Sequence, residues 1–151
     1  MTTATLEHHR VETDLINQLK SEYLEETYKQ DTLLIDDIEF DNGVLTTTLN
    51  VANFCPDTKG KFHLSATTAF RIVQQLGVII VQLNHGIKEK TEEIWMSSCN
   101  LKFNQPIVNL QIPIVVSIKS STVQPSVRHD LVEASFSNGA FIIEANSYMP
   151  L

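Results

Sequence analysis

One continuous stretch, from Lys61 to Ile87, constrains the fold of this chain more than any other part. Ser65 suits a helix N-cap, and apolar residues then recur at spacings of three and four, the period of an α-helix. The sequence Asn-His-Gly at 84–86 is a typical helix stop. A helix from Ser65 to Asn84 would be about 30 Å long, which is about the width of a small domain. We therefore expect the rest of the chain to fold around it.

The second half of this predicted helix has an unusual composition. Val78 to Leu83 is apolar on nearly all sides, so we expect it to be covered on most sides. Val78 to Val81 alone would also suit a strand, because β-branched residues favour sheets, but the Ala- and Gln-rich first half favours the helix. Gly77 costs a helix interior roughly 0.5–1 kcal/mol relative to alanine. It allows either close packing of helix on sheet or room for a ligand tail.

Length and charge limit the class of protein. The 151 residues predict a flexible tail at 1–10 and a single domain at 11–151. The net charge of −7 argues against nucleic acid or an anionic membrane surface as a partner. Two cysteines, Cys55 and Cys99, suit a reducing compartment. The N-terminus lacks an apolar signal region and no apolar run reaches about 18 residues, so we expect a cytoplasmic protein without a membrane span.

The other elements follow from periodicity and turn residues. Residues 11–28 read as an amphipathic helix, and Asp41-Asn42-Gly43 is a hairpin turn. Pro113 marks an edge strand or a bulge, and Asn138-Gly139 marks a second turn. The predicted strands are Leu33 to Phe40, Val44 to Val51, Ile94 to Phe103, Leu110 to Ser121, Val127 to Ser137 and Ala140 to Met149.

This order of elements predicts an α+β fold. The late hairpin-like joins favour a mostly antiparallel sheet, and a long central helix wrapped by such a curved sheet is the hotdog fold. One such sheet leaves a free edge and a half-covered helix. Pairing edge to edge in a two-fold dimer resolves both, so we expect a homodimer or a higher homo-oligomer.

Three short segments make the sequence similar to a known family. Gly60-Lys61-Phe62 opens the predicted helix, and Gln75-Leu76 lies within it. Met96 to Pro106, with the sequence MSSCNLKFNQP, follows as a strand that ends in a polar residue and a proline. Together these segments resemble the FcoT-like thioesterases, a family of hotdog proteins, over about residues 28–149.

The resemblance implies binding of fatty acyl chains that are carried as thioesters on coenzyme A or acyl carrier protein. Family members are also linked to the addition of glycine to an enoyl thioester in lipopeptide pathways. The family's functional residues are several tyrosines and an asparagine; Tyr28 matches the first tyrosine, and Gln74 takes the place of the asparagine with an equivalent amide. Cys55 and Val78 stand where the family has tyrosines. The resemblance therefore supports an acyl-binding fold better than it supports the family's catalytic residues.

Hotdog thioesterases and dehydratases commonly place a carboxylate on the central helix, but the predicted helix contains neither Asp nor Glu. His63, just before the cap, would titrate near neutral pH as a base, or it is a polar loop residue or a core histidine. Asp57 orients water or His63, or forms an Asx-turn beside Pro56. Gln74 needs a partner among apolar neighbours, either a structural group or a thioester carbonyl whose developing oxyanion its amide would stabilise.

The start of the helix is the preferred place for a thioester carbonyl, because its N–H groups lack intrahelical partners. The acyl chain would lie in a tunnel lined by Val73 and its helical neighbours. Tyr28 reaches the tunnel mouth or simply packs, and Cys55 is a nucleophile or an inert thiol. The predicted binding residues are Tyr28, Cys55, Phe62, Ser65, Ala66, Thr67, Phe70 and Gly77.

These observations predict an enzyme that hydrolyses, or transforms in a related way, a fatty or polyketide acyl thioester. One alternative is a non-catalytic acyl-binding or scaffold protein, which the missing helix carboxylate favours. The other is a dehydratase or enoyl-thioester-modifying enzyme of secondary metabolism. We expect no metal and no cofactor apart from coenzyme A or phosphopantetheine within the substrate, and acyl carrier protein is a candidate partner.

Overall fold

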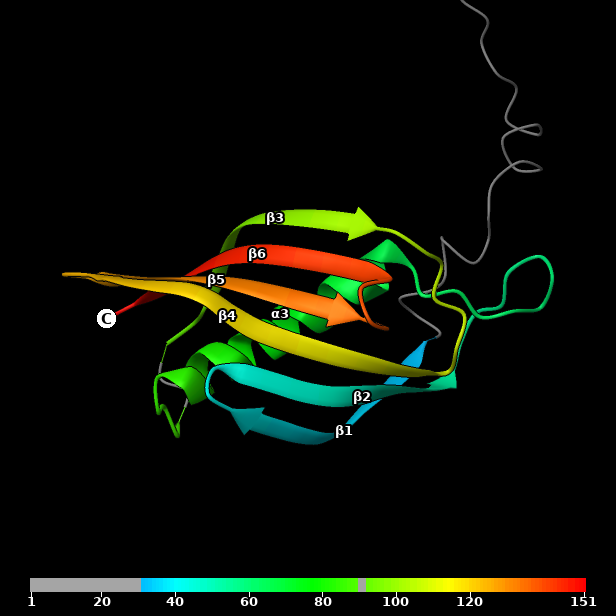
Figure 1. Cartoon of the computed structure of the whole chain (residues 1–151), viewed down its shortest axis with the longest axis horizontal. Helices are drawn as coiled ribbons and strands as arrows, with labels where there is room; N and C mark the ends of the chain where they lie inside the picture. Colours follow the sequence, from blue (N-terminus) through cyan, green and yellow to red (C-terminus); the bar gives the residue numbers. More distant parts are fainter. Residues whose placement is uncertain (1–30, 90–91) are drawn as a thin grey trace, which may run out of the picture.

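The computed structural model describes residues 31–89 and 92–151, which form one long helix and six strands (Figure 1). The predicted tail at 1–10, the predicted helix at 11–28 and Tyr28 lie outside the described residues. The elements are β1 (Thr32–Asp41), β2 (Val44–Asn53), α3 (Ala66–Asn84), β3 (Trp95–Phe103), β4 (Gln111–Gln124), β5 (Val127–Phe136) and β6 (Phe141–Pro150).

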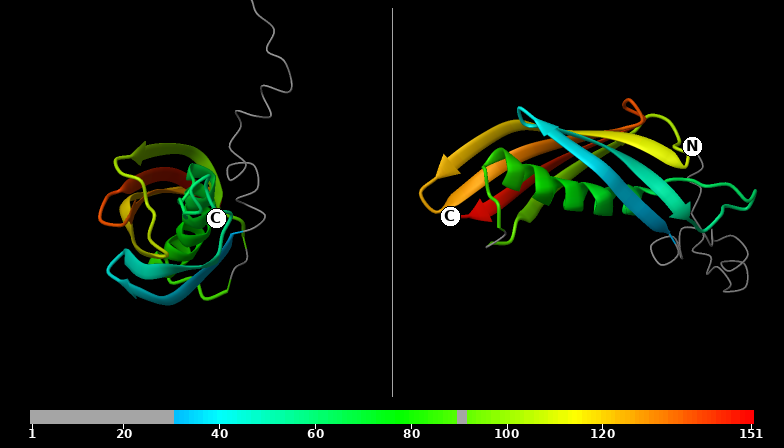
Figure 2. Two further views of the ribbon diagram at one scale, coloured as in Figure 1. Left: turned by 90° about the vertical axis from the view of Figure 1, so that its right-hand side faces the viewer. Right: turned by 90° about the horizontal axis from the view of Figure 1, so that it is seen from below.

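All six strands form one antiparallel sheet with the order β1-β2-β4-β5-β6-β3. The sheet curves around α3, which lies along its concave face and packs chiefly on β4 and β5 (Figure 2). The expected α+β arrangement, a long helix wrapped by a curved antiparallel sheet, is therefore confirmed. β1 and β3 are the two edges of the sheet.

The boundaries of α3 agree with the sequence signals. The Ser65 hydroxyl oxygen accepts a hydrogen bond from the Thr68 N–H at 3.1 Å, and Gly86 ends the helix with a left-handed φ of 66°. Val78 to Val81 is helical, not extended. The expected cover is only partial, because Val78 and Ile79 are half-buried and Leu83 is exposed. The buried stripe of α3 consists of Thr68, Ala69, Ile72, Val73, Leu76, Ile80 and Val81.

Two tight turns set the register of the sheet as predicted. Asn42 and Gly43 have φ angles of 47° and 76°, and Asp41 pairs directly with Val44. Such paired positive φ values suit a hairpin turn because their twist matches that of the strands. Residues 137–139 likewise have positive φ values and join β5 to β6. This second turn pairs β6 with β5, and β6 then pairs with the edge strand β3.

Pro113 marks neither an edge strand nor a bulge. β4 is an interior strand, in which Pro113 pairs with Thr48 of β2. Its carbonyl accepts a hydrogen bond from the Ser137 N–H at 2.9 Å, just past the end of β5. The missing N–H of proline points to the same side as its carbonyl, where the ladder with β5 has already ended. The irregular pairing in β4 lies instead between Ile118 and Ser120.

Among the described residues, α3 is long and apolar enough to cross a membrane by length and composition alone. Its apolar stripe contacts β4 and β5, which is the arrangement of a core helix. The hydrophobic core lies between this stripe and the inner face of the sheet. Its largest fully buried side chains come from β2, β4, β5 and β6 as well as from α3.

Candidate functional site

His63 and Asp57 contact each other directly in the loop before α3. The His63 Nε2 atom lies 2.8 Å from the Asp57 Oδ2 atom. The side chains are 35% and 14% exposed, so the pair is shielded but open to solvent on the histidine side. Of the three residues predicted to carry chemistry, the structure brings these two together. A carboxylate that faces an imidazole at this distance fixes the orientation of the ring.

Asp57 also organises its own loop. Its Oδ1 atom accepts hydrogen bonds from the Lys59 and Lys61 N–H groups, each at 2.8 Å, and its carbonyl accepts from the Gly60 N–H at 2.9 Å. One carboxylate oxygen of Asp57 therefore closes an Asx-turn, and the other faces His63. The Lys61 N–H, the Lys59 N–H and His63 hold the pKa of Asp57 below its usual range. Asp57 is thus a carboxylate at neutral pH, and its Oδ2 atom can accept a hydrogen bond from the Nε2–H group of His63.

His63 borders an open pocket of about 280 Å³, which we call the His63 pocket. The neighbouring Leu64 N–H donates to the Ile107 carbonyl at 2.9 Å, which ties this loop to the segment after β3. Phe103 ends β3 and Phe141 begins β6, and their rings meet edge to face at 4.6 Å. The pocket is lined by His63, Leu64, Phe103, Asn104, Gln105, Pro106, Ile107 and Phe141.

The start of α3 divides the predicted contacts into two groups. Ser65 is buried and its hydroxyl oxygen caps the helix, so it has a structural role, and its predicted contact with substrate stays a prediction. Phe62 is also buried, and its ring packs edge-on against Phe54 at 5.3 Å. Ala66 and Thr67 are exposed. Their N–H groups precede the first intrahelical bond, so they are the donors that a carbonyl oxygen could use here.

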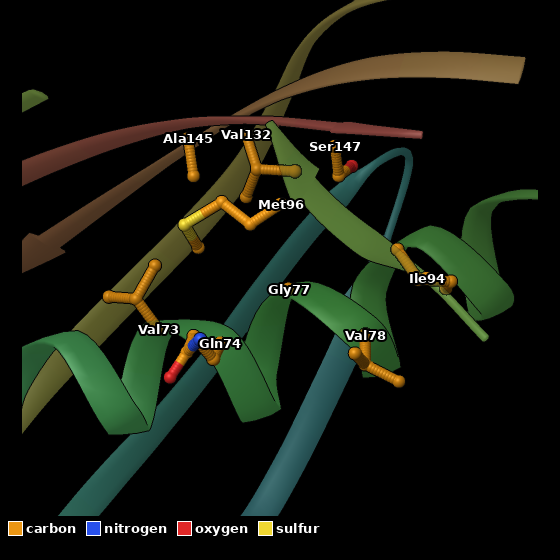
Figure 3. A pocket seen from close by; sticks show the side chains of 9 residues that line it. All are labelled: Val73, Gln74, Gly77, Val78, Ile94, Met96, Val132, Ala145 and Ser147. Carbon is orange, nitrogen blue, oxygen red and sulfur yellow. The ribbon is translucent and has the colours of Figure 1, made fainter. Parts of the chain in front are cut away.

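A second, smaller pocket of about 70 Å³ lies beside Gly77 (Figure 3), and we call it the Gly77 pocket. A Cβ atom placed on Gly77 would meet no atom within 4 Å. Close helix–sheet packing therefore does not explain this glycine, and the room for a ligand tail stays a prediction. Phe70 is half-buried but does not line the pocket. The lining residues are Val73, Gln74, Gly77 and Val78 of α3, with Ile94, Met96, Val132, Ala145 and Ser147 opposite.

Gln74 does not belong to the His63 site. It lies nine positions after Ser65, which is about 14 Å along a helix axis. It is exposed between the Gly77 pocket and a wider groove of about 650 Å³ on the β1 side of α3. Gln74 therefore needs no buried partner, contrary to the expectation from its apolar neighbours. The three residues predicted to carry chemistry are split between two places.

Cys55 lies in a third environment, beside an acid that the sequence did not single out. The Cys55 N–H donates to the Asp31 Oδ1 atom at 3.1 Å, whereas the Cys55 thiol is 4.0 Å from the Pro56 carbonyl oxygen. Burial raises the pKa of Asp31. This acid precedes β1 in an acid-rich part of the chain, so no local pattern distinguishes it. Met96 and Ser147 of the Gly77 pocket were also missed, because only the register of β3 on β6 brings them together.

No protein-family model and no curated protein sequence matches the chain. Solved structures resemble it in fold. A candidate thioesterase from Shewanella oneidensis is 13% identical, with a TM-score of 0.56 over 79% of this chain and 82% of that one. A conserved protein from Pseudomonas aeruginosa is 14% identical, with a TM-score of 0.56 over 89% and 96%. A hypothetical thioesterase from Streptococcus pneumoniae, solved with coenzyme A, is 12% identical, with a TM-score of 0.50 over 79% and 87%.

These likenesses concern the fold. One helix packed against a large antiparallel sheet is the hotdog arrangement that this chain shares with proteins described as thioesterases. The narrower resemblance to the FcoT-like thioesterases stays a prediction. At these identities the site must be judged on its own residues, and of the three residues predicted to carry chemistry, His63 and Asp57 are the two in contact.

Proposed function

We propose that this protein is an acyl-thioester hydrolase whose general base is His63. The observation that carries the proposal is the 2.8 Å contact between His63 and Asp57 at the rim of an open pocket beside the start of α3. The fold supports it, because proteins described as thioesterases share the same helix-on-sheet arrangement. The FcoT-like resemblance points to the same substrate class.

In the proposed reaction, Nδ1 of His63 takes a proton from a water molecule as the water oxygen attacks the thioester carbonyl. Asp57 keeps the proton on Nε2 and stabilises the imidazolium that forms. When the tetrahedral intermediate collapses, the C–S bond breaks and the imidazolium returns the proton to the thiolate. The products are a carboxylic acid and the free thiol of the carrier.

The start of α3 supplies the complementary electrostatics. The N–H groups of the exposed residues Ala66 and Thr67 would donate to the carbonyl oxygen as it becomes negative, and the helix dipole adds to their effect. This role needs only backbone groups. It is therefore compatible with a helix that carries no acid, and it leaves Ser65 free to cap.

Coenzyme A and acyl carrier protein are the proposed carriers. The side chains of Lys59 and Lys61 are exposed on the turn that holds Asp57, where they could meet phosphate groups or an acidic carrier. One structural neighbour was solved with coenzyme A. Assaying the same acyl group on both carriers, with a Lys59→Ala/Lys61→Ala double variant, separates the two possibilities.

The decisive experiment compares His63→Ala with His129→Ala in hydrolysis of a panel of acyl thioesters. We expect His63→Ala to lower kcat by about 10²–10⁴-fold, the usual contribution of a general base. His129 is an exposed histidine beside Tyr148 and away from the pocket, so His129→Ala should retain full activity. If both variants hydrolyse every thioester at the wild-type rate, His63 is not the base.

A non-catalytic acyl-binding protein is the second candidate, and one observation favours it. α3 carries no acidic residue, although hotdog enzymes of this kind commonly use one there. Tight binding of an acyl thioester without release of thiol over many hours would support this candidate. Release of water from a 3-hydroxyacyl thioester, followed by the absorbance of the enoyl product, would instead identify a dehydratase.

We also propose that two copies pair through β3. This strand is a sheet edge with Trp95 and Phe103 exposed at its ends, 54% and 47% respectively. Unpaired edges that carry large apolar side chains favour association. Sedimentation should give about twice the 17.0 kDa chain mass. Charges introduced by Trp95→Lys and Phe103→Lys should shift the protein to a monomer, and a wild-type monomer would contradict the proposal.

A further inference from the structure

The inner face of β3 forms a half-exposed apolar strip that joins the two pockets. Residues directly opposite each other in a sheet share a face, and four β3 residues lie opposite inward residues of β6. The strip begins at Met96 in the Gly77 pocket and ends at Phe103 in the His63 pocket. Its pairs are Met96 with Ser147, Cys99 with Ala145, Leu101 with Ile143, and Phe103 with Phe141. The β6 partners are all buried, and the β3 members are all at least partly exposed.

α3 contributes a second apolar stripe, which meets the β3 strip at the Gly77 pocket. Phe70, Val73 and Gly77 recur at spacings of three and four, so they lie on one stripe of the helix. Val73 and Gly77 reach the Gly77 pocket, and Phe70 lies one turn nearer the start of the helix. Neither the helix stripe nor the β3 strip contains a charged residue. An apolar chain could therefore lie between them without desolvating a charge.

We propose that Gly77 marks the far end of an acyl chain that starts beside His63, and that the substrates are medium-chain acyl thioesters of about 11–14 carbons. This inference rests on the proposed function. Phe141 and Ala145 are four strand residues apart, about 14 Å. Ser65 and Gly77 are twelve helix residues apart, about 18 Å. An extended alkyl chain advances about 1.3 Å per carbon, given C–C bonds of about 1.5 Å, so these spans correspond to about 11–14 carbons.

The size of the Gly77 pocket explains why the path should end there. Its volume of about 70 Å³ is about five times what one water needs, so it holds the last few carbons of a chain and no more. Met96, Val132 and Ser147 close the side opposite the helix (Figure 3). A side chain at position 77 would enter this space directly, because nothing else occupies it. Gly77 is therefore the residue that sets the length limit.

The test uses acyl-CoA substrates from 2 to 18 carbons with the full-length protein. Gly77→Leu should move the preferred chain length several carbons shorter. It should lower kcat/KM by about tenfold for chains whose last two methylenes no longer fit in the pocket. The kcat/KM of short chains of about six carbons should be unchanged. Met96→Ala enlarges the same pocket and should move the preference to longer chains. Gln75→Ala, on the other side of α3, is the matched control and should leave the profile unchanged.

The outcomes separate this inference from the proposed function. Hydrolysis with an optimum outside about 8–16 carbons, or a Gly77→Leu loss that is equal at every chain length, overturns the length limit but leaves the hydrolase. No binding and no turnover of any acyl thioester, measured by thermal shift and thiol release, overturns both. A cooperative unfolding transition shows that the Gly77→Leu variant is folded. Met96→Ala gives an independent result of opposite sign if that variant does not fold.

Discussion

Replacing Gly77 by alanine should make the unliganded protein more stable. Glycine in a helix interior costs roughly 0.5–1 kcal/mol relative to alanine, because it loses more backbone freedom on folding. A steric clash would cancel that gain, but the added Cβ meets no atom within 4 Å. For a chain of this length, a gain of 0.5–1 kcal/mol raises Tm by about 1–4 °C.

The measurement is reversible unfolding in urea, analysed for both the midpoint and the slope, with thermal unfolding as a second probe. The midpoint should rise while the slope stays the same, because the surface exposed on unfolding hardly changes. Gly86→Ala is the matched control. Nothing lies within 4 Å of its Cβ position either, but Gly86 has a left-handed φ of 66°. The same substitution there should cost about 1–2 kcal/mol through backbone strain.

Two results would refute this reasoning. A Gly77→Ala variant that is less stable than the wild type would mean that the space beside position 77 is filled, so the glycine is there for packing. A Gly86→Ala variant that gains as much as Gly77→Ala would mean that the gain is not specific to a relaxed helical position. The first result would also remove the structural basis for an acyl chain that ends at Gly77.

Three further predictions concern stability. Ser65→Ala removes the bond to the Thr68 N–H and should cost about 1 kcal/mol in urea unfolding, whereas Ser65→Asp should recover most of it. His85→Ala should lower the free energy of unfolding by about 1–3 kcal/mol, because the Asp130 side chain is only 1% exposed and would lose its partner at 3.1 Å. In a double-mutant cycle of His85→Ala and Asp130→Ala, losses that simply add would show that the two side chains are not coupled. The lowered pKa of Asp57 implies a stabilisation that is present above the pKa of the unfolded chain and is lost as the pH falls through the lower folded value. Unfolding between pH 2 and 7 should therefore show that Asp57→Asn is less stable than the wild type at neutral pH and equal to it in acid.

Local signals explain why much of the fold could be predicted. The hairpin at Asn42-Gly43 and the two ends of α3 depend on residues within one turn of each other, so the backbone geometry follows from the side chains present. Six strands were found within a few residues of their observed limits. The predicted burial of the second half of α3 was too high, because an apolar side chain indicates burial but does not indicate which element contacts it. Val78 and Ile79 are only half-buried within one chain.

The site was less predictable because it depends on distant contacts. Asp57 and His63 lie close in sequence, yet the pattern allowed either a turn or an orienting contact, and only the structure shows that its two carboxylate oxygens do both. The Gly77 pocket needs Met96 to lie opposite Ser147, about fifty residues later. Neither helical nor strand periodicity in the sequence predicts which residues of β3 and β6 lie opposite each other. Gln74 was assigned to the chemistry from the family pattern, and the length of the helix separates it from His63.

The proposed base lies in the loop, which would explain why α3 needs no acid. A carboxylate on the helix would project beside any acyl chain that runs along it, and an apolar chain next to a charge costs free energy through desolvation. Asp57 avoids this because its turn is closed by backbone N–H groups and needs nothing from α3. In the proposed binding mode, the stripe of Phe70, Val73 and Gly77 then presents no charge along the acyl chain. Introducing a carboxylate by Val73→Glu should therefore weaken long-chain substrates far more than short ones, whereas an equal loss at every chain length would place the acyl chain elsewhere.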